Sequence, residues 1–332
     1  MSKTLTISVA AYNIEPYIHK LMDTLISSNC MDDLEILIVD DGSKDNTGKI
    51  AKEYEKEYPN SVILVSKENG GHGSTINKGI ELATGKFFRA LDGDDWVNGE
   101  NLFELVQVLK RAEVDLVICD YDKCYTDGSV ETLKFDHISP MKELAFVDAI
   151  KTIEWMCYHT IIYRTEILKK NDIRLDEHCF YVDAEYDLFP IPYIRSILYF
   201  NKPVYCYRLG IDGQSVSPES RKKNINHGYI VAQKLLGLCR NLPKSLSDAQ
   251  KDYIISGTAD HCIWHIQSMM LFDSSVTQKS SIKSFDNMIK NTSLEVYNKM
   301  MELGKPSRIV KLLRRSNYNA YWIIKIYKAI KM

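Results

Sequence analysis

The sequence predicts an α/β protein with a mixed, mainly parallel sheet flanked by helices, followed by a helical C-terminal extension. Over the first 92 residues, short runs rich in β-branched residues alternate with single segments of helical length. This alternation is typical of βαβ crossovers between parallel strands. A polar turn also follows each run, as expected where strand ends meet at one edge of a sheet and bind ligands.

The first four strands are predicted from apolar runs, and each is followed by a helical pattern or a polar turn. The strands cover residues 5–12, 34–40, 61–66 and 86–92. The intervening helices are expected from about Glu15, from about Thr47 with Asn46 or Thr47 able to cap, and over residues 74–83.

The pattern becomes less regular in the second half of the chain. Residues 114–121 predict a further strand, and the Asp127-Gly128 pair that follows is a good hairpin signal. Helical patterns dominate after about residue 220. The other expected elements are an acidic loop over residues 176–189, a pair of strands over 196–200 and 204–209, and a helix capped by Ser247 and Gln250.

Composition excludes several classes of protein. The 332 residues are 45% hydrophobic and 26% charged, as in ordinary globular proteins, and a net charge of -2 gives no general affinity for nucleic acid. The eight cysteines form no C-x-x-C pair, and the first residues lack the order of a signal peptide, so we expect a reduced, cytoplasmic protein. No window of about 18 residues is apolar enough to cross a bilayer.

Three carboxylates follow the fourth strand, in the segment Asp92-Gly93-Asp94-Asp95. A surface turn is one interpretation, because Asp-Gly is common turn chemistry. The other is a site for Mg²⁺ or Mn²⁺, since carboxylates one residue apart supply hard oxygen ligands and such ions complete their shell with substrate phosphates. The position of the cluster at the ligand edge favours the metal site and a phosphorylated substrate.

Two other strand ends carry polar clusters. Asp40 and Asp41 can be part of a turn, or a carboxylate here can accept hydrogen bonds from a ribose or a base. The glycines of residues 68–74 precede a helix and suit backbone N–H groups that face an anion. Their spacing is not that of a Rossmann dinucleotide site, and His72 among them is as compatible with a loop as with a ligand contact.

Residues 8–13, 36–47 and 68–97 together resemble the amino-terminal half of family 2 glycosyltransferases with the GT-A fold. The resemblance covers about the first 110 residues closely and continues loosely to about residue 220. It implies a sugar-nucleotide-dependent hexosyltransferase. We expect a GT-A domain over residues 1–225, with a nucleotide-binding half to about 115 and an acceptor half from about 116, and a helical region over 226–332.

The resemblance also assigns site residues. Asp92 and Asp94 are expected to form the D-x-D element that holds Mn²⁺ or Mg²⁺ and the diphosphate. The residues expected to bind the nucleotide are Tyr12, Asp41, Asn69, Gly70, Asn77 and Asp92.

A catalytic aspartate is expected in the acidic segment, where the family commonly has Glu-Asp. Asp183 matches that aspartate, but Val182 stands where the glutamate is common, so Glu185 and Asp187 remain rivals for the general base. A structural pairing of Asp183 with Arg164 or Arg174 also stays open.

Other residues are assigned less directly. Ile76 stands where many relatives carry an arginine, and His72 or Lys78 can replace the lost contact. Contacts to the acceptor or the diphosphate are expected of Asp95, His159, Glu185 and Arg208, with a core histidine and an exposed arginine as the alternatives for His159 and Arg208.

The resemblance implies a single displacement with inversion, from a nucleotide sugar, with a UDP-sugar expected first, to a glycan or polyprenyl-diphosphate-linked acceptor in cell-surface polysaccharide synthesis. Residues 305–332 contain eight Lys or Arg and no acid, with Ile323, Ile326, Tyr327 and Ile330 at helical spacing. Such a tail can contact an anionic membrane. The enzyme would then lie at the inner face of the plasma membrane, whereas a helix packed on the core is the alternative.

Two rival functions remain at this point. A non-catalytic, sugar-nucleotide-binding module is supported by the departures at Ile76 and Val182 but not by the intact D-x-D element. A haloacid-dehalogenase-type phosphatase shares an apolar run followed by D-x-D, but its motif normally follows the first strand rather than the fourth.

Overall fold

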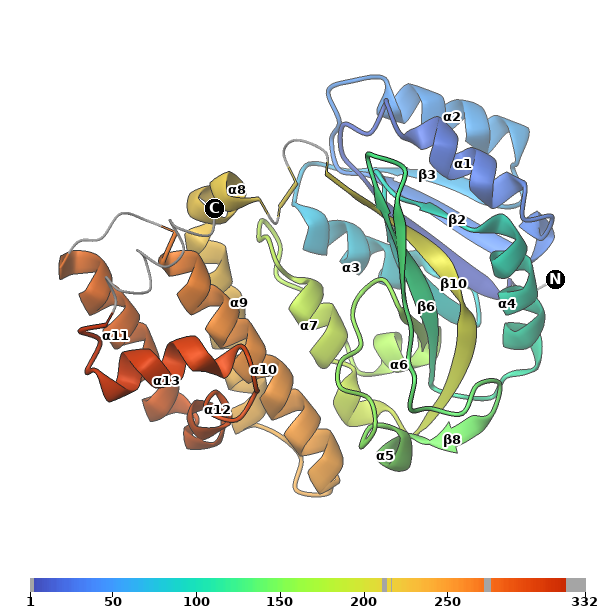
Figure 1. Ribbon diagram of the computed structural model, residues 1–332. Helices are drawn as coiled ribbons and strands as arrows, with labels where there is room; N and C mark the ends of the chain where they lie inside the picture. Colours follow the sequence, from blue (N-terminus) through green and yellow to red (C-terminus); the bar gives the residue numbers. More distant parts are fainter. Residues whose placement is uncertain (1–2, 211–213, 216, 272–275, 321–332) are drawn as a thin grey trace. The chain divides into compact units, whose positions relative to one another are not determined.

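The computed structural model describes residues 3–210, 214–215, 217–271 and 276–320 (Figure 1). The chain forms two compact units, Met1–Asp212 and Gly213–Met332, and each is described by itself.

The first unit begins with four parallel strands in the order β3-β2-β1-β4. They are β1 (Leu5–Ala11), β2 (Leu34–Asp40), β3 (Val62–Ser66) and β4 (Phe87–Asp92), and they are joined or followed by α1 (Ile18–Ile26), a 3-10 helix (Met31–Asp33), α2 (Thr47–Glu57), α3 (His72–Leu82) and α4 (Gly99–Arg111). Every residue of β2 is buried, which requires cover on both faces of the sheet. In Figure 1, α1, α2 and α4 lie on one side of these strands and α3 lies on the other.

These elements confirm the predicted alternation of strands and helices, with two local differences. α1 begins at Ile18 because Glu15 belongs to a loop, where its carboxylate accepts hydrogen bonds from the backbone and side-chain N–H groups of Asn46. The predicted cap of α2 is wrong. The Thr47 hydroxyl accepts from the N–H of Ile14 instead, and the carboxylate of Asp45 accepts from the N–H of Thr47.

The sheet becomes mixed at β9 (Ile161–Arg164), which is antiparallel to both β4 and β6 (Leu116–Tyr125). β6 then pairs in parallel with the long strand β10 (Ser196–Leu209). The predicted mixed, mainly parallel sheet is therefore confirmed. The remaining elements of this unit are β5 (Trp96–Val97), β7 (Val130–Leu133), β8 (Glu143–Ala145), α5 (Phe146–Ala149), α6 (Thr165–Lys170), α7 (Asp183–Leu188) and a 3-10 helix (Ile191–Tyr193).

Three predictions for this half have different outcomes. The hairpin between β6 and β7 is confirmed, with Gly128 at a φ of 87°. The two strands expected over 196–200 and 204–209 form one strand, β10, whose register against β6 shifts on either side of Pro203. Proline has no N–H to donate, so it is tolerated at such an irregularity. The segment expected as an acidic loop contains the helix α7.

The second unit is helical, as predicted. The Ser247 side chain accepts a hydrogen bond from the N–H of Gln250 at 3.3 Å, which confirms the predicted cap at the start of a helix. The helices are α8 (Pro218–Lys223), α9 (Ile225–Arg240), α10 (Asp248–Met269), α11 (Val276–Thr292), α12 (Leu294–Lys299) and α13 (Ser307–Arg315).

A buried ion pair joins α11 to α13. Arg314 donates to the two carboxylate oxygens of Asp286 at 2.9 and 2.6 Å, and its guanidinium lies 3.5 Å from the centre of the Tyr297 ring. The hydroxyl of Tyr318 also donates to Asp286. Asp286 is 1% exposed, so its charge depends on these donors for compensation.

Asp286→Ala is expected to lower the free energy of unfolding of the helical unit by about 3 to 5 kcal/mol, because it leaves the charge of Arg314 buried without its carboxylate. Urea unfolding followed by far-UV circular dichroism measures this loss. Asp252→Ala is the matched control, since Asp252 pairs with Lys299 at 2.5 Å with a side chain 64% exposed. Its loss should stay below about 1 kcal/mol. Equal losses in the two variants would contradict the importance of burial.

Among the described residues, no helix is both long and apolar enough to cross a membrane. The structure describes only part of the predicted basic tail. Residues 305–320 include α13, with Arg308, Lys311, Arg314 and Arg315, whereas Ile323, Ile326, Tyr327 and Ile330 lie outside the described residues.

Candidate active site

The carboxyl ends of β1, β2 and β4 lie at one edge of the sheet. In the parallel register Ala11 is opposite Asp40, and Ala10 is opposite Asp92. Polar residues that are far apart in sequence therefore gather at this edge, as expected for a ligand site in an open α/β sheet. Tyr12, directly after β1, is 50% exposed there.

Asp41 organises the loop between β3 and α3. Its buried carboxylate accepts hydrogen bonds from the N–H groups of Gly70 at 2.9 Å and Gly71 at 2.8 Å, and it pairs with the Lys67 ammonium at 2.6 Å. The side chain of Asn69 donates to the main-chain oxygen of Asp41 at 3.0 Å. The structure thus brings Asp41, Asn69 and Gly70 together. It also adds Lys67, which the sequence analysis did not single out.

Asn77 ties α3 to the segment before α7. Its side-chain amide donates to the carbonyl of Leu175 at 2.9 Å and accepts from the N–H of the same residue at 2.8 Å. Gly73 allows the close approach, since a Cβ there would lie 2.2 Å from the carbonyl oxygen of Asp176. Asn77 is 7% exposed, so its present contacts are structural and hold α7 near the start of α3.

The Asp92–Asp95 segment is a tight turn around Gly93. A Cβ at Gly93 would lie 2.7 Å from the carbonyl oxygen of Ala10, so glycine is needed for this approach to β1. The carboxylate of the buried Asp95 accepts from the hydroxyl of Tyr205 and from the N–H of Arg208, both at 2.7 Å. These bonds attach the turn to β10.

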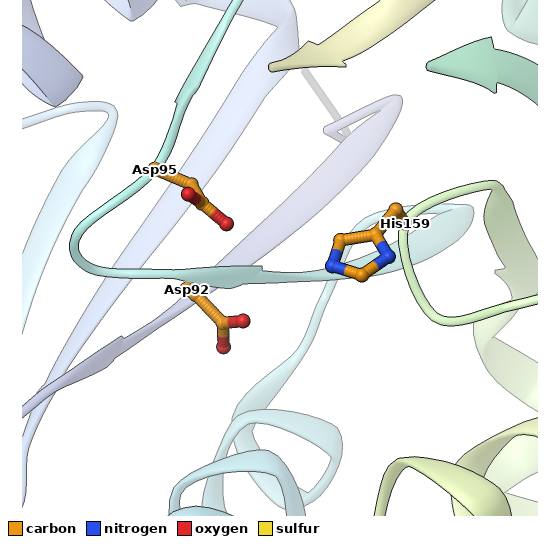
Figure 2. A group of neighbouring side chains, drawn as sticks. All are labelled: Asp92, Asp95 and His159. Carbon is orange, nitrogen blue, oxygen red and sulfur yellow. The ribbon is translucent and has the colours of Figure 1, made fainter. Parts of the chain in front are cut away.

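The structure brings together Asp92, Asp95 and His159, each of which offers a ligand atom within 4.8 Å of the others (Figure 2). Figure 2 shows Asp92 at the end of β4, Asp95 on the turn that follows, and the imidazole approaching from the segment before β9. Burial lowers the pKa of His159 to about 4, which leaves the imidazole neutral and able to ligate a metal. Two carboxylates and a neutral imidazole are a donor set that can hold a divalent metal ion.

Asp94 is not a member of that group, although the D-x-D pattern pairs it with Asp92. It is partly exposed on the same turn, and burial together with the charge of Asp92 raises the pKa of Asp94 to about 6. Uncompensated carboxylate charge of this kind is what a divalent cation relieves. Asp92 and Asp94 thus repel each other across the turn.

His72 lies between two carboxylates. Its Nε2 atom is 2.9 Å from Oδ1 of Asp92, and its Nδ1 atom is 3.7 Å from Oδ1 of Asp183. Burial opposes the imidazolium form, but the charges of Asp92 and Asp183 outweigh burial and raise the pKa of His72 to about 9. For Asp92 itself, burial would raise the pKa, yet His72 and its hydrogen bond lower it.

Asp183, at the start of α7, differs from its rivals in exposure. Its side chain is 56% exposed and faces His72, whereas Glu185 and Asp187 are 0% and 4% exposed. Glu185 accepts the N–H of Asp176 at 2.8 Å. Burial raises the pKa of Asp187 well above its ordinary value. Of the three carboxylates, Asp183 is therefore the one whose side chain is accessible from solvent.

Two alternatives from the sequence can be compared with the side-chain contacts in the structure. One is the pairing of Asp183 with an arginine, and the other is the replacement of the arginine that many relatives carry at the position of Ile76. Arg164 pairs with Glu113 and Arg174 with Asp172, so neither arginine pairs with Asp183 in these contacts. Ile76 is buried in α3. Lys78 pairs with Glu81 at 2.8 Å, which leaves His72 as the suggested replacement that lies at the site.

Arg208 and His159 have more specific surroundings than the sequence analysis could assign. Arg208 donates from Nε to the carbonyl oxygen of Asp94 at 2.7 Å, and its guanidinium lies over the rings of Tyr17 and Trp96. The ring of His159 is surrounded by aromatic rings, with centroid distances of 5.2, 4.8 and 4.3 Å to Tyr121, Tyr205 and Tyr207. Both residues therefore border the carboxylate turn.

Sequence reasoning missed two tyrosines at the site. The Tyr158 hydroxyl donates to Oδ1 of Asp92 at 3.2 Å, and the Tyr205 hydroxyl accepts the N–H of Asp92 at 3.2 Å. The alternation of Tyr205 and Tyr207 along β10 was a signal that both face one side of the sheet. Nothing in the sequence indicated that this side meets Asp92.

Comparison with known families and structures gives a consistent result. The model of the family described as glycosyl transferase family 2 matches residues 6–171. The putative glycosyltransferase EpsH of Bacillus subtilis is 29% identical over 235 residues, which are 68% of this chain and 65% of that protein. The poly(ribitol-phosphate) beta-N-acetylglucosaminyltransferase TarS of Staphylococcus aureus is 26% identical over 260 residues, which are 76% of this chain and 43% of that protein. The chain thus spans less than two thirds of the length of these relatives.

Two solved structures share the fold. Residues 1–349 of S. aureus TarS, in complex with UDP-GlcNAc, match with a TM-score of 0.61 and 21% identity over 95% of this chain and 92% of that one. The mannosyltransferase PcManGT of Pyrobaculum calidifontis, in complex with GDP-Man and Mn²⁺, matches with a TM-score of 0.56 and 15% identity over 99% and 88% of the two chains. At these identities the likeness supports the GT-A fold expected from the sequence.

Proposed function

Because this chain belongs to glycosyl transferase family 2, we propose that it transfers a sugar from a nucleoside-diphosphate sugar to a hydroxyl of a glycan or lipid-linked acceptor in cell-surface polysaccharide synthesis. The observation that carries the proposal is the alignment of an exposed carboxylate, Asp183, with the carboxylate turn of Asp92 and Asp94 through the imidazole of His72. This arrangement places a group that can accept a proton beside groups that can hold a metal and a diphosphate.

The nucleotide is proposed to lie along the edge formed by Tyr12, Asp41, Asn69 and Gly70, within the half of the GT-A domain that ends near residue 115. The N–H groups of Gly70 and Gly71 and the Lys67 ammonium pair with the carboxylate of Asp41 and so fix the shape of this edge, while the exposed ring of Tyr12 is open to contact a nucleotide. A UDP-sugar is the first donor to test, since the TarS structures contain UDP-GlcNAc and UDP. Asn77 is proposed to contribute by fixing the loop, because its amide is held by Leu175.

We assign a divalent ion, Mn²⁺ or Mg²⁺, to Asp92 and Asp94. Asp95 fits this role less well because both of its oxygens already accept hydrogen bonds from β10. An ion in this position supplies Lewis-acid stabilisation of the departing diphosphate. Arg208, fixed on the carbonyl of Asp94, adds positive charge on the same side.

The acceptor hydroxyl is proposed to lose its proton to Asp183 as its oxygen attacks the anomeric carbon. The bond from that carbon to the diphosphate oxygen breaks in the same step, so the configuration inverts. His72 holds Asp183 and Asp92 in their relative positions. The acceptor is proposed to be bound by the half of the domain over about residues 116–225, with His159 near it. Contact of the C-terminal tail with an anionic membrane would suit an acceptor carried on a polyprenyl diphosphate.

Calorimetric titration tests this proposal directly. UDP-GlcNAc, UDP-glucose and GDP-mannose are titrated into the protein with Mn²⁺ and again with EDTA, and the hydrolysis of each donor is followed over hours. We expect one donor to bind in the presence of Mn²⁺ and to lose most of its affinity in EDTA. Absence of binding for all three donors would overturn the proposal. Metal-dependent binding without transfer or hydrolysis would favour a non-catalytic module.

A further inference from the structure

A cavity of about 390 Å³ lies in the first unit, and none of the residues of the carboxylate turn lines it. Its walls come from the hairpin of β6 and β7, from the loop after β7, and from residues 152–160. This volume is within the range of sites that bind small molecules, about 300 to 1,000 Å³.

The lining combines flat aromatic faces with polar groups. Tyr121, Phe135 and Trp155 contribute rings, and the carboxylates come from Asp136 and Glu154. Trp155 is 37% exposed, so part of its surface is accessible to a ligand. Thr152 and Thr160 complete the wall, with their hydroxyls donating to the backbone carbonyls of Ala149 and Cys157.

This chemistry suits a sugar ring better than a lipid chain or a phosphate. A lipid chain gains nothing from two carboxylates, whose desolvation costs free energy. A phosphate would meet two carboxylates and a single lysine, Lys134, so the charge of the lining disfavours an anion. A pyranose has an apolar C–H face that packs on an aromatic ring and hydroxyl groups that donate to carboxylates.

The cavity shares a wall with the candidate active site. Cys157 and Thr160 line the cavity, while the two residues between them, Tyr158 and His159, contact the carboxylate side. Tyr121 also lines the cavity and stacks on His159 with a centroid distance of 5.2 Å and an angle of 19°. A glycan bound in the cavity would therefore end close to the proposed site of transfer.

We propose that this cavity is a distal subsite that binds a sugar residue of the acceptor, one that does not carry the attacking hydroxyl. Calling the bound sugar part of an acceptor rests on the proposed function. The binding of a sugar ring in this cavity can still be measured independently of transfer. It also predicts that an acceptor of several sugar units is used more efficiently than a single sugar.

Saturation-transfer NMR tests the subsite with methyl β-glycosides of glucose, galactose, mannose and N-acetylglucosamine. The variants are Phe135→Leu, which keeps an apolar contact with Tyr199, and Glu154→Gln, which changes an exposed carboxylate. Phe103→Leu and Glu104→Gln on α4 are the matched controls, since Phe103 is 41% exposed and Glu104 lies on the surface.

We expect at least one glycoside to bind the wild type, and each cavity variant to raise its Kd at least about fivefold, the loss expected for one aromatic contact or one charged hydrogen bond. The control variants and the affinity for a nucleotide sugar should not change. Absence of glycoside binding, or equal binding by all variants, overturns the subsite. If glycosides bind in the cavity but no nucleotide sugar binds the protein, the cavity is confirmed as a sugar-binding site and the proposed transferase function fails.

Discussion

Asp183→Asn should lower kcat for transfer by about 10²- to 10⁴-fold, the usual contribution of a general base. The amide has nearly the same shape but cannot accept the proton of the acceptor hydroxyl. Because Asp183 lies exposed at the start of α7 and its contact with His72 is long, at 3.7 Å, we expect donor affinity and stability to remain close to those of the wild type. Steady-state transfer and calorimetric donor binding, measured on the same preparation, separate these effects.

Asp172→Asn is the matched control for that experiment. Asp172 is on the same stretch of chain, with a side chain 83% exposed and paired with Arg174, and it lies outside the site. The control should retain full activity. If Asp183→Asn also retained full activity, the base would have to be sought elsewhere, and the buried Asp187 and Glu185 would require a conformational change to act.

Asp92→Asn should weaken the binding of the donor in Mn²⁺ by at least about 100-fold, because changes to the outer-shell partners of metal ligands alone cost roughly 10- to 100-fold. The residue is common to both candidate ligand sets, since it belongs to the D-x-D element and also lies within 4.8 Å of Asp95 and His159. Calorimetry with Mn²⁺ and EDTA measures the loss. Donor affinity that is equal for wild type and variant in Mn²⁺ would refute a metal at this turn.

Two further variants test whether Asp94 or Asp95 holds the ion together with Asp92. Asp94→Asn should abolish most of the metal dependence if the ion faces the exposed side of the turn. Asp95→Asn should mainly destabilise the fold, by about 1 to 3 kcal/mol, because its carboxylate receives the hydroxyl of Tyr205 and the N–H of Arg208. The reverse result would assign the ion to Asp92, Asp95 and His159 instead.

The amino-terminal half of the fold could be predicted because each element there has a local signal. β1, β2, β3 and β4 are apolar runs separated by helices, and their parallel order follows from the crossovers. The later part could not be predicted as well. β9 has four residues and lies between strands that precede it by tens of residues, so its pairing depends on long-range packing rather than on its own sequence.

The same distinction applies to the candidate site. The carboxylates of the Asp92–Asp95 turn were predicted as site residues because they follow a strand at the ligand edge of the sheet, and the family resemblance then matched Asp92 and Asp94 to a D-x-D element and Asp183 to a catalytic aspartate. The contacts of Asp92 with His72, Tyr158 and Tyr205 join residues separated by 20, 66 and 113 positions. No periodicity in the sequence reports such distances. The assignments of the metal ligands and of the general base therefore began from the sequence. The position of His72 between Asp92 and Asp183 came from the structure.

The antiparallel pairing of β9 with β4 determines where the chain can be truncated and how its amino-terminal part behaves during synthesis. Residues 3–111 already contain the whole of the β3-β2-β1-β4 sheet, but β4 obtains its outer neighbour when residues 161–164 pair with it. A fragment that ends after α4 would therefore leave the first residues of β4, Phe87 and Phe88, without the strand that pairs with them. Unpaired edges of this kind recruit other chains, so we expect such a fragment to aggregate as it leaves the ribosome. Expression of the amino-terminal half as a donor-binding protein would accordingly require the segment through Arg164.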